Sequence, residues 1–452
     1  MIISNTRITQ AVSNFSDYYK EIQILSSIAS ERDKDGINNR LLRSILNGEV
    51  TLALHRLVPI DIRKEAGLFF TSNTLAEKVA FRLAPLLQRG TKLWDPACGA
   101  GNLLLACAQY LPMGKNIDET LTIWSDLIFG CDLYIDFIRV AQLRLVLMAL
   151  SRHPEEKYMP DRFKPHQIFK GLNLRDAFAQ PSMEQGMCIA VNPPFCYIQA
   201  PTDCKWATGK IQAAAWFFEQ LLYRTTKGQH IVAILPDVLR SGTRYRRWRN
   251  IISSLCYSID IENAGRFDNS TDVDVFIIHA IRGNGNSVQC EWPTFNLKID
   301  DRSHVVSDFF DVRIGSVVPH RDLLKGPSYP YIHARTAPAW QTVKIIPEKR
   351  RYTGTVFSPP FLVVHRTSSP SDKHRCVATI INEKRNVAVE NHLLVLIPHD
   401  RSLESCEQLL KLLKSAHTNE WLNNRIRCRH LTVSAIRELP CSAIGNNNKS
   451  NL

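Results

Sequence analysis

The sequence predicts a doubly wound α/β fold with a mostly parallel sheet, followed by a smaller α+β domain. From residue 92 onward, short apolar runs alternate with amphipathic stretches, which is the order of strands and crossover helices in a parallel sheet. After residue 281 this alternation stops, and the chain becomes richer in proline, histidine and short β-like runs. A chain of 452 residues is also too long for one ordinary hydrophobic core, so two large units are expected.

The individual elements follow from these patterns. Residues up to about 62 contain short helical segments such as 39–46 and are interpreted as a helical N-terminal extension. The predicted strands are 92–94, 127–131, 187–191, 231–235, 257–262 and 273–280. The predicted helices are 102–110, 135–150 and 211–225. The chain is therefore divided into an extension (1–62), an α/β domain (63–285) and a C-terminal domain (286–452), with the second boundary near Asn286.

Composition and charge narrow the class of protein. The chain has 44% hydrophobic residues and a formal net charge of +13, which is typical of a globular protein with a polyanionic partner. Residues 286–452 contain 23 Lys and Arg against 15 Asp and Glu, a net charge of +8. The twelve cysteines form no CxxC pair, so no metal site is predicted. The N-terminus lacks a basic stretch followed by an apolar run, and we expect a cytoplasmic protein without a membrane partner.

Two acidic residues and a glycine turn suggest a nucleoside-binding loop. Gly99 and Gly101 follow the first predicted strand, where they allow a tight turn and a close approach of the backbone to a ligand. Asp95 precedes this turn, and Asp132 ends the next strand, where a carboxylate can accept both hydroxyls of a ribose. The number of residues between the two acids is larger than usual for such folds, which requires an insertion over about residues 111–125. The alternatives are a plain strand-to-helix turn and a helix N-cap at Asp132.

The tetrapeptide Asn192-Pro193-Pro194-Phe195 follows a predicted buried strand, and so stands at the carboxyl edge of the sheet. The prolines stiffen the loop, and the Asn192 side-chain oxygen and the Pro193 carbonyl can accept both hydrogens of a planar amino group. Holding both hydrogens favours pyramidalisation, which frees the nitrogen lone pair to attack the methyl group of a sulfonium. Phe195 offers a flat surface for an extruded base. The alternative is a proline-stiffened turn with an Asn cap.

These motifs resemble those of the adenine-specific amino-methyltransferases of DNA, in the class with the cofactor motifs first and target recognition last. DPACGAG resembles the cofactor loop of that family, GCDL its ribose-binding acid, and NPPF its catalytic tetrapeptide. GLFFT at residues 67–71 is similar to the family's GxxYTP segment, with Ser72 in place of the proline. Residues 231–240 and 265–276 resemble two further catalytic-domain segments, and 423–440 resembles the end of family recognition domains.

The resemblance implies a Rossmann-like class I methyltransferase domain, S-adenosyl-L-methionine as cofactor and double-stranded DNA as substrate. It also leaves room for a separate cognate restriction endonuclease as partner. The catalytic residues that it implies are Asn192, Pro193, Pro194 and Phe195. The cofactor-binding residues that it implies are Thr71, Asp95, Pro96, Ala97, Gly99, Gly101, Asp132, Asp176 and Asn192. Asp176 is the weakest of these correspondences, because Leu172 stands where the family pattern has an acid.

Other functions and other candidate residues are compatible with parts of this pattern. A glutamine methyltransferase acting on release factors has a similar tetrapeptide but a much shorter chain. A cytosine-N4 methyltransferase usually has Ser at the position of Asn192, and a non-catalytic relative would have a damaged site. Arg244, Arg246, Arg247 and Arg249 could bind phosphates or form a solvated helix face. Trp206 follows NPPF, where family members contact DNA, and is a candidate for that contact by position.

Overall fold

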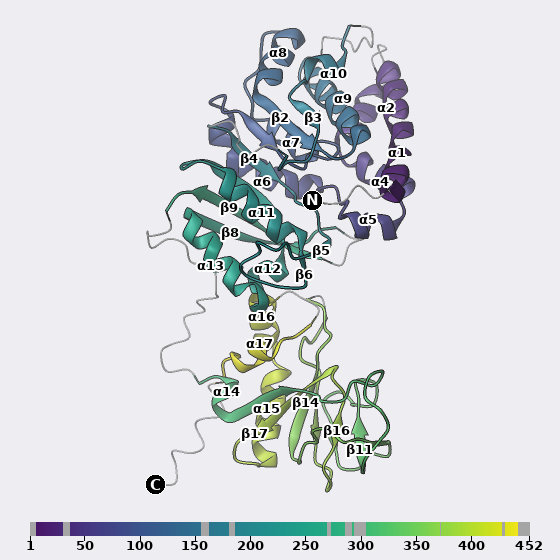
Figure 1. Cartoon of the computed structure of the whole chain (residues 1–452), viewed down its shortest axis with the longest axis vertical. Helices are drawn as coiled ribbons and strands as arrows, with labels where there is room; N and C mark the ends of the chain where they lie inside the picture. Colours follow the sequence, from purple (N-terminus) through teal and green to yellow (C-terminus); the bar gives the residue numbers. More distant parts are fainter. Residues whose placement is uncertain are drawn as a thin grey trace. The chain divides into compact units, whose positions relative to one another are not determined.

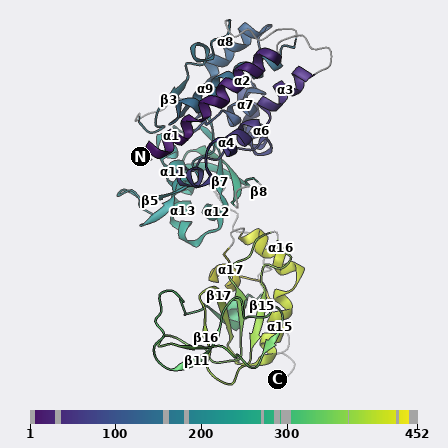
Figure 2. The same cartoon turned by 90° about the vertical axis from the view of Figure 1, so that its right-hand side faces the viewer.

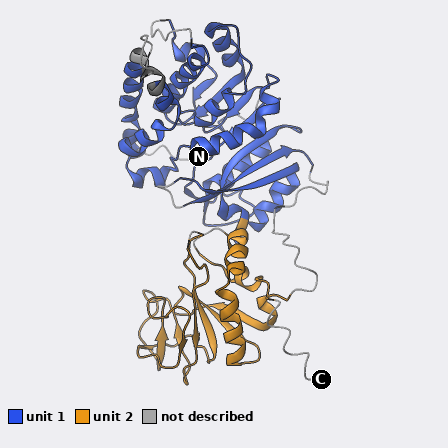
Figure 3. Ribbon diagram, turned by 180° about the vertical axis from the view of Figure 1, so that it is seen from behind, with its two compact units in different colours: residues 1–240, 244–292 blue, residues 241–243, 293–452 orange. Residues whose placement is uncertain are grey.

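The structure of the chain is a computed structural model. The structure describes residues 6–29, 37–154, 162–179, 186–268, 273–284, 292, 304–370, 372–426 and 430–441. Two compact units are present: residues 1–240 with 244–292, and residues 241–243 with 293–452 (Figure 3). The predicted boundary near Asn286 lies outside the described residues. Within the described parts of the chain, no helix is both long enough and apolar enough to cross a membrane.

A seven-stranded sheet with the order β3-β2-β1-β4-β7-β9-β8 forms the centre of the first unit (Figure 1). Its strands are β1 Leu93–Asp95, β2 Ile128–Asp132, β3 Leu172–Leu174, β4 Cys188–Val191, β7 His230–Pro236, β8 Cys256–Arg266 and β9 Asp274–Arg282. The first five strands in this order are parallel, whereas β9 is antiparallel to both of its neighbours. A separate two-stranded ribbon follows β4, formed by β5 Tyr197–Gln199 and β6 Lys210–Gln212. This is the predicted doubly wound, mostly parallel fold.

The helices cover both faces of the sheet. They are α1 Thr6–Ser13, α2 Phe15–Ala29, α3 Ile37–Leu46, α4 Glu49–Leu57, α5 Ile60–Ala66, α6 Asn73–Leu87, α7 Asn102–Ala108, α8 Ile117–Leu127, α9 Ile135–Ser151, α10 Pro165–Ile168, α11 Ala213–Arg224, α12 Asp237–Ser241 and α13 Arg246–Leu255, with a 3-10 turn at Thr243–Tyr245. Strand residues alternate between two cores: Cys188 and Ala190 face α6, α7 and α9, whereas Ile189 and Val191 face α11 and α13. This two-residue period is expected of strands buried on both faces.

The N-terminal helices share the core of the sheet domain. Helices α2 and α3 pack on α9 (Figure 2). The Phe15 ring meets Phe137 of α9 edge-to-face with 5.0 Å between the ring centroids, and it meets Phe70 at 5.9 Å. Because these rings belong to one continuous hydrophobic cluster, the N-terminal segment is an integral part of the first unit.

The second unit combines sheets with helices packed on one face. Its strands are β10 Phe310–Ile314, β11 Ser328–Ile332, β12 Thr342–Val343, β13 Lys349–Arg351, β14 Phe361–His365, β15 Ala378–Ile381, β16 Ala388–Val389 and β17 Leu393–Pro398. Its helices are α14 Val306–Phe309, α15 Leu403–Leu413, α16 Ala416–Arg425 and α17 Val433–Arg437. The main sheet has the order β10-β17-β14-β15-β12, and β13-β11-β16 form a smaller one. Leu394 and Leu396 face the helices, whereas Leu393 and Val395 face the opposite side.

Most predicted elements of the first unit are present with small changes at their ends. All six predicted strands and all three predicted helices are found. The short strand β3 was not among the predicted strands. The segment predicted to hold an insertion contains α8, which leads directly into β2.

Candidate active site

Three loops meet at the carboxyl edge of the parallel strands. Strand β1 lies between β2 and β4, with Asp95 opposite Gly130 and Trp94 opposite Ile189. The turn at 96–101, the segment after Asp132 and the tetrapeptide at 192–195 each follow one of these strands. Ligands of doubly wound folds bind at this edge.

The turn between β1 and α7 needs both of its glycines. Gly99 and Gly101 have φ values of 50° and 85°, in the left-handed region. A Cβ atom at Gly99 would lie 2.9 Å from the Phe70 ring, and one at Gly101 would lie 3.0 Å from the Ala141 Cβ. The two glycines therefore shape the turn and admit its close packing against neighbouring side chains.

The two predicted acids lie beneath and beside this turn. Asp132 Oδ2 accepts a hydrogen bond from the Gly99 N–H at 2.9 Å, and its Oδ1 accepts one from the Tyr134 N–H at 3.0 Å. Burial raises the pKa of Asp132 to about 6, although these N–H groups favour the ionised form. Asp95 is only 1% exposed, and its Oδ1 accepts from the Ala97 N–H at 3.0 Å. Burial, and secondarily the charge of Asp132, raise the pKa of Asp95 to about 8.

Residues 67–71 connect the turn with the tetrapeptide. Gly67 has a φ of 70°, and a Cβ atom there would lie 2.8 Å from both the Phe195 nitrogen and the Pro194 Cβ. The buried Thr71 accepts a hydrogen bond at its carbonyl oxygen from Asn102 Nδ2 at 2.6 Å. The structure thus brings Thr71 and the glycine turn together through Asn102, the first residue of α7.

Asn192 presents a buried oxygen without a partner. Its Nδ2 donates to the Phe69 carbonyl oxygen at 3.0 Å. Because a carbonyl only accepts, this contact fixes the orientation of the amide and turns Oδ1 away from Phe69. Among the described residues, Oδ1 has no hydrogen-bond partner although it is buried. Buried polar atoms are rarely left unpaired, so this oxygen is a candidate acceptor for a ligand that brings a donor.

The aromatic residue of the tetrapeptide rests on a second ring. Phe195 is half-buried and meets the fully buried Phe267 edge-to-face, with 5.2 Å between the ring centroids. Pro193 is buried and Pro194 half-buried. Part of the segment 265–276, which the sequence associates with this site, lies outside the described residues at 269–272.

The third strand brings Asp176 to the same edge. Leu174 of β3 pairs with Asp132, so Asp176 follows two residues beyond the end of the strand. Its Oδ1 accepts from the Phe178 N–H at 2.9 Å. The leucines beside these acids are unusually exposed: Leu133 by 38% and Leu174 by 54%. Sequence reasoning missed both, because an apolar residue at a strand end is no signal without knowledge of its exposure.

Arg144 was also missed, and it organises the back of the glycine turn. Its guanidinium is fully buried on α9 and donates to the Ala100 carbonyl and to Asn102 Oδ1, each at 2.6 Å. It also donates to the carbonyls of Ile45 and Leu46, at the carboxyl end of α3, at 3.1 and 3.2 Å. Burial lowers the pKa of Arg144 to about 10. One side chain thereby ties the N-terminal helices to the turn.

Trp206 does not present its ring to solvent. It is 3% exposed, packs against Tyr245 and donates from Nε1 to Glu219 at 2.5 Å. The expectation of a DNA contact at Trp206 is therefore not supported by its position. Within the basic run, Arg244 and Arg249 donate to backbone carbonyls. Arg244, Arg246 and Arg247 are exposed, whereas Arg249 is half-buried.

Several solved structures are similar to this chain. The Type IIL restriction-modification enzyme MmeI, solved in complex with DNA, has a TM-score of 0.55 at 14% identity, covering 93% of this chain and 79% of that one. The type IIG restriction endonuclease BpuSI has a TM-score of 0.46 at 14% identity, covering 91% of this chain and 62% of that one. The DrdV–DNA complex has a TM-score of 0.40 at 13% identity, covering 56% of this chain and 30% of that one.

The chain thus spans less than two thirds of BpuSI and DrdV. At these identities the likeness to MmeI concerns the fold. The match in sequence is more specific, because residues 60–257 fit the family model described as N-6 DNA Methylase. This segment contains the glycine turn, both acids and the tetrapeptide, so the similarity to the N-6 DNA methylase family model covers the part of the chain in which these motifs lie.

Proposed function

We propose that this chain transfers a methyl group from S-adenosyl-L-methionine to the exocyclic N6 of an adenine that is flipped out of duplex DNA. The observation that carries the proposal is the buried, unpartnered Oδ1 of Asn192 at the edge where the three loops meet. An acceptor in this state suits a substrate that brings its own donor, such as an amino group. Leaving it unpaired costs about 1–3 kcal/mol in the free protein, which binding would recover.

The residues around the glycine turn fit the cofactor. The Asp132 carboxylate accepts the backbone N–H groups of Gly99 and Tyr134, and its remaining lone pairs can accept the two ribose hydroxyls. Leu133 follows Asp132 in the sequence, and Leu174 pairs with Asp132 across the sheet. Both leucines are exposed and offer apolar surface for an adenine ring. Thr71, Pro96, Ala97 and Gly101 are proposed to line the remainder of this site. When bound, S-adenosyl-L-methionine supplies a methyl group on a positively charged sulfur.

Asn192 and Pro193 are proposed to act on the amino group of the base. The Asn192 oxygen and the Pro193 carbonyl accept its two hydrogens, which reduces delocalisation of the nitrogen lone pair into the ring. These contacts strengthen as the nitrogen becomes tetrahedral and positively charged, so they act mainly in the transition state. The Phe69 carbonyl holds the amide in place, and no strong general base is required.

Phe195 is proposed to stack on the extruded adenine. Its half-exposed ring is supported from behind by Phe267, so its orientation is set before the base arrives. Stacking on an aromatic ring contributes about 1–3 kcal/mol per base. This offsets part of the energy needed to unstack the base from the duplex.

The C-terminal residues 286–452 are proposed to form the target recognition domain. Their net charge of +8 is suited to a polyanion, and most of them form the separate second unit. We further propose a role in restriction-modification, because the chain is similar in fold to the restriction-modification enzyme MmeI and residues 60–257 match the N-6 DNA methylase model.

The atom that is methylated can be identified directly. Duplex DNA of mixed sequence is incubated with the full chain and methyl-labelled S-adenosyl-L-methionine, digested to nucleosides and separated by chromatography. We expect label only in N6-methyladenosine. Label in N4-methylcytosine would replace adenine by cytosine as the substrate, and label confined to an added protein would overturn the DNA assignment.

A further inference from the structure

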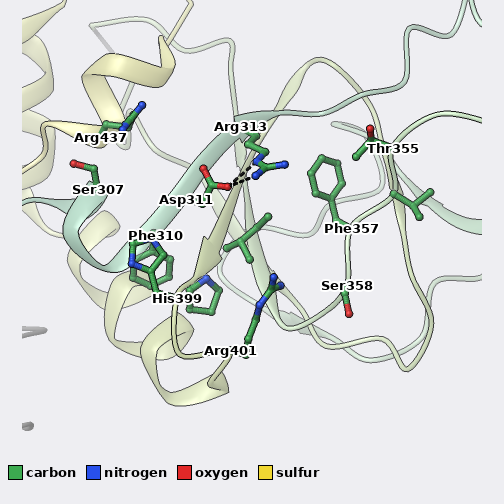
Figure 4. Close-up of a pocket in the computed structure, with 13 residues that line it drawn as sticks. Ser307, Phe310, Asp311, Arg313, Thr355, Phe357, Ser358, His399, Arg401 and Arg437 are labelled. Atoms are coloured by element: carbon green, nitrogen blue, oxygen red, sulfur yellow. Dashed lines mark hydrogen bonds and ion pairs between the residues drawn. The ribbon is translucent and has the colours of Figure 1, made fainter.

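A cavity of about 570 Å³ lies within the second unit, away from the glycine turn and the tetrapeptide in the sequence (Figure 4). It is lined by β10, the end of β17, the loop at 355–358 and Arg437 of α17. Its apolar lining includes Phe310 and Phe357, which are 1% and 4% exposed. Since these side chains are held in the core, the cavity has a fixed wall.

The charged lining is strongly positive. Arg401 and Arg437 are exposed, and neither forms an ion pair with a carboxylate in the described part of the chain. Arg313 is paired with Asp311, with Nε 2.7 Å from Oδ2. Three arginines and one aspartate leave a net charge of +2 on the lining. In Figure 4 the three guanidinium groups come from different sides of the cavity.

The turn that carries Arg401 is held in an unusual conformation. Arg401 has a φ of 57°, in the left-handed region that a non-glycine residue rarely adopts. The preceding Asp400 accepts hydrogen bonds from the Ser402 N–H at 3.0 Å and from the hydroxyls of Ser402 and Ser405 at 2.9 and 2.7 Å. The charge of Asp400 is therefore engaged by the start of α15, and Arg401 keeps its charge available. Such strain persists where the surrounding contacts enforce it, and it concentrates at ligand-binding sites.

We propose that this cavity binds the phosphodiester backbone of duplex DNA through Arg401 and Arg437. The inference rests on the proposed function, in which DNA is the substrate. It assigns DNA binding to one part of the second unit. Guanidinium groups bind phosphate oxygens in bidentate fashion, and the hydroxyls of Ser307, Thr355 and Ser358 at the same cavity are neutral donors for the same oxygens.

Contacts to phosphate carry no sequence information, and this gives the proposal its test. The full chain and its R401A/R437A double variant are titrated into two fluorescein-labelled 30-base-pair duplexes of unrelated sequence over a range of salt concentrations. Each phosphate contact contributes about −0.9 to the slope of log K against the logarithm of the salt concentration. We therefore expect the slope of the double variant to be less negative by roughly 1.8. At 0.1 M salt this corresponds to roughly 60-fold weaker binding to both duplexes.

The matched control is R335A/K349A, which removes two exposed charges of the same unit outside the cavity. We expect it to change binding much less, and both double variants to bind S-adenosyl-L-methionine as the wild type does. Equal losses in the control would overturn the site, as would a loss confined to one duplex, which would indicate base readout. Competition by millimolar mononucleotide would indicate a nucleotide site instead. If the wild type methylates DNA but R401A/R437A keeps its affinity, only the cavity assignment fails; if the wild type binds neither duplex, the proposed function fails with it.

Discussion

Replacing Asn192 with alanine separates the chemistry of the site from its stability. The variant removes the buried Oδ1 acceptor and the hydrogen bond from Nδ2 to the Phe69 carbonyl, while leaving the glycine turn and its acids untouched. If Oδ1 holds an amino hydrogen in the transition state, its removal slows methyl transfer without weakening cofactor binding.

The two effects of the substitution differ in size. Removing one preorganised polar group that acts on developing charge typically lowers the rate by about 100- to 1,000-fold. For stability, losing the bond to Phe69 costs about 1 kcal/mol, whereas removing an unpaired buried oxygen relieves about 1–3 kcal/mol. The N192A protein should therefore be as stable as the wild type or slightly more stable, and yet nearly inactive.

Three measurements on the full chain check this expectation. Single-turnover methyl transfer to duplex DNA gives the rate, isothermal calorimetry gives the affinity for S-adenosyl-L-methionine, and thermal denaturation gives the stability. The matched control is N173A, because Asn173 is an exposed asparagine on β3, outside the proposed contacts. It should behave as the wild type in all three.

Retention of activity by N192A would contradict the role proposed for Oδ1. If N192A kept more than about one tenth of the wild-type rate, the loss of activity would be too small for a transition-state contact of this kind. A large fall in cofactor affinity, or a melting temperature far below that of the wild type, would instead mean that Asn192 supports the fold of the edge.

Three further predictions concern the elements that hold this edge together. Gly67→Ala should slow methyl transfer more than Gly90→Ala does, because both have left-handed φ values but only Gly67 meets other atoms within 4 Å. Stabilisation by the cofactor should increase from about pH 5 to about pH 7 as Asp132, with a pKa of about 6, becomes the ionised acceptor of the ribose hydroxyls, and D132N should lose this increase. Arg144→Met should lower the free energy of unfolding by about 3–5 kcal/mol, because four oxygens lose a buried charged donor, and R144K should recover part of the loss.

The sign of the pH effect on the unbound protein is opposite to that on cofactor binding. Because the folded pKa of Asp132 is raised from 3.8 to about 6, the stability that its neutral form contributes is lost as the pH rises through about 6. Equal activities of the two glycine variants, a cofactor effect independent of pH, or an unchanged unfolding midpoint for R144M in urea would each contradict the corresponding prediction.

The α/β architecture and the motifs of the proposed site can be predicted from local patterns of residues. Strands such as β4 and β7 are buried on both faces, so their apolar runs are continuous and bounded by turns. Gly99, Gly101 and the tetrapeptide are local signals, since each directly follows a strand and its residue types limit the backbone. These features depend on neighbours along the chain and can therefore be predicted without the fold.

Which polar groups are paired and which remain available depends on contacts between distant segments. Strand β3 is short and lies at the edge of the sheet, so its residues show no clear alternation of apolar and polar side chains. It is recognised as a strand only by its pairing with β2. The partners of Arg144 come from α3 and the glycine turn. The Phe69 carbonyl that orients the Asn192 amide is 123 residues away in sequence. Trp206 is buried by Tyr245 and Glu219, contrary to its expected place at the surface. Burial and hydrogen bonding between distant segments are properties of the packed chain, and no local pattern of residues encodes them.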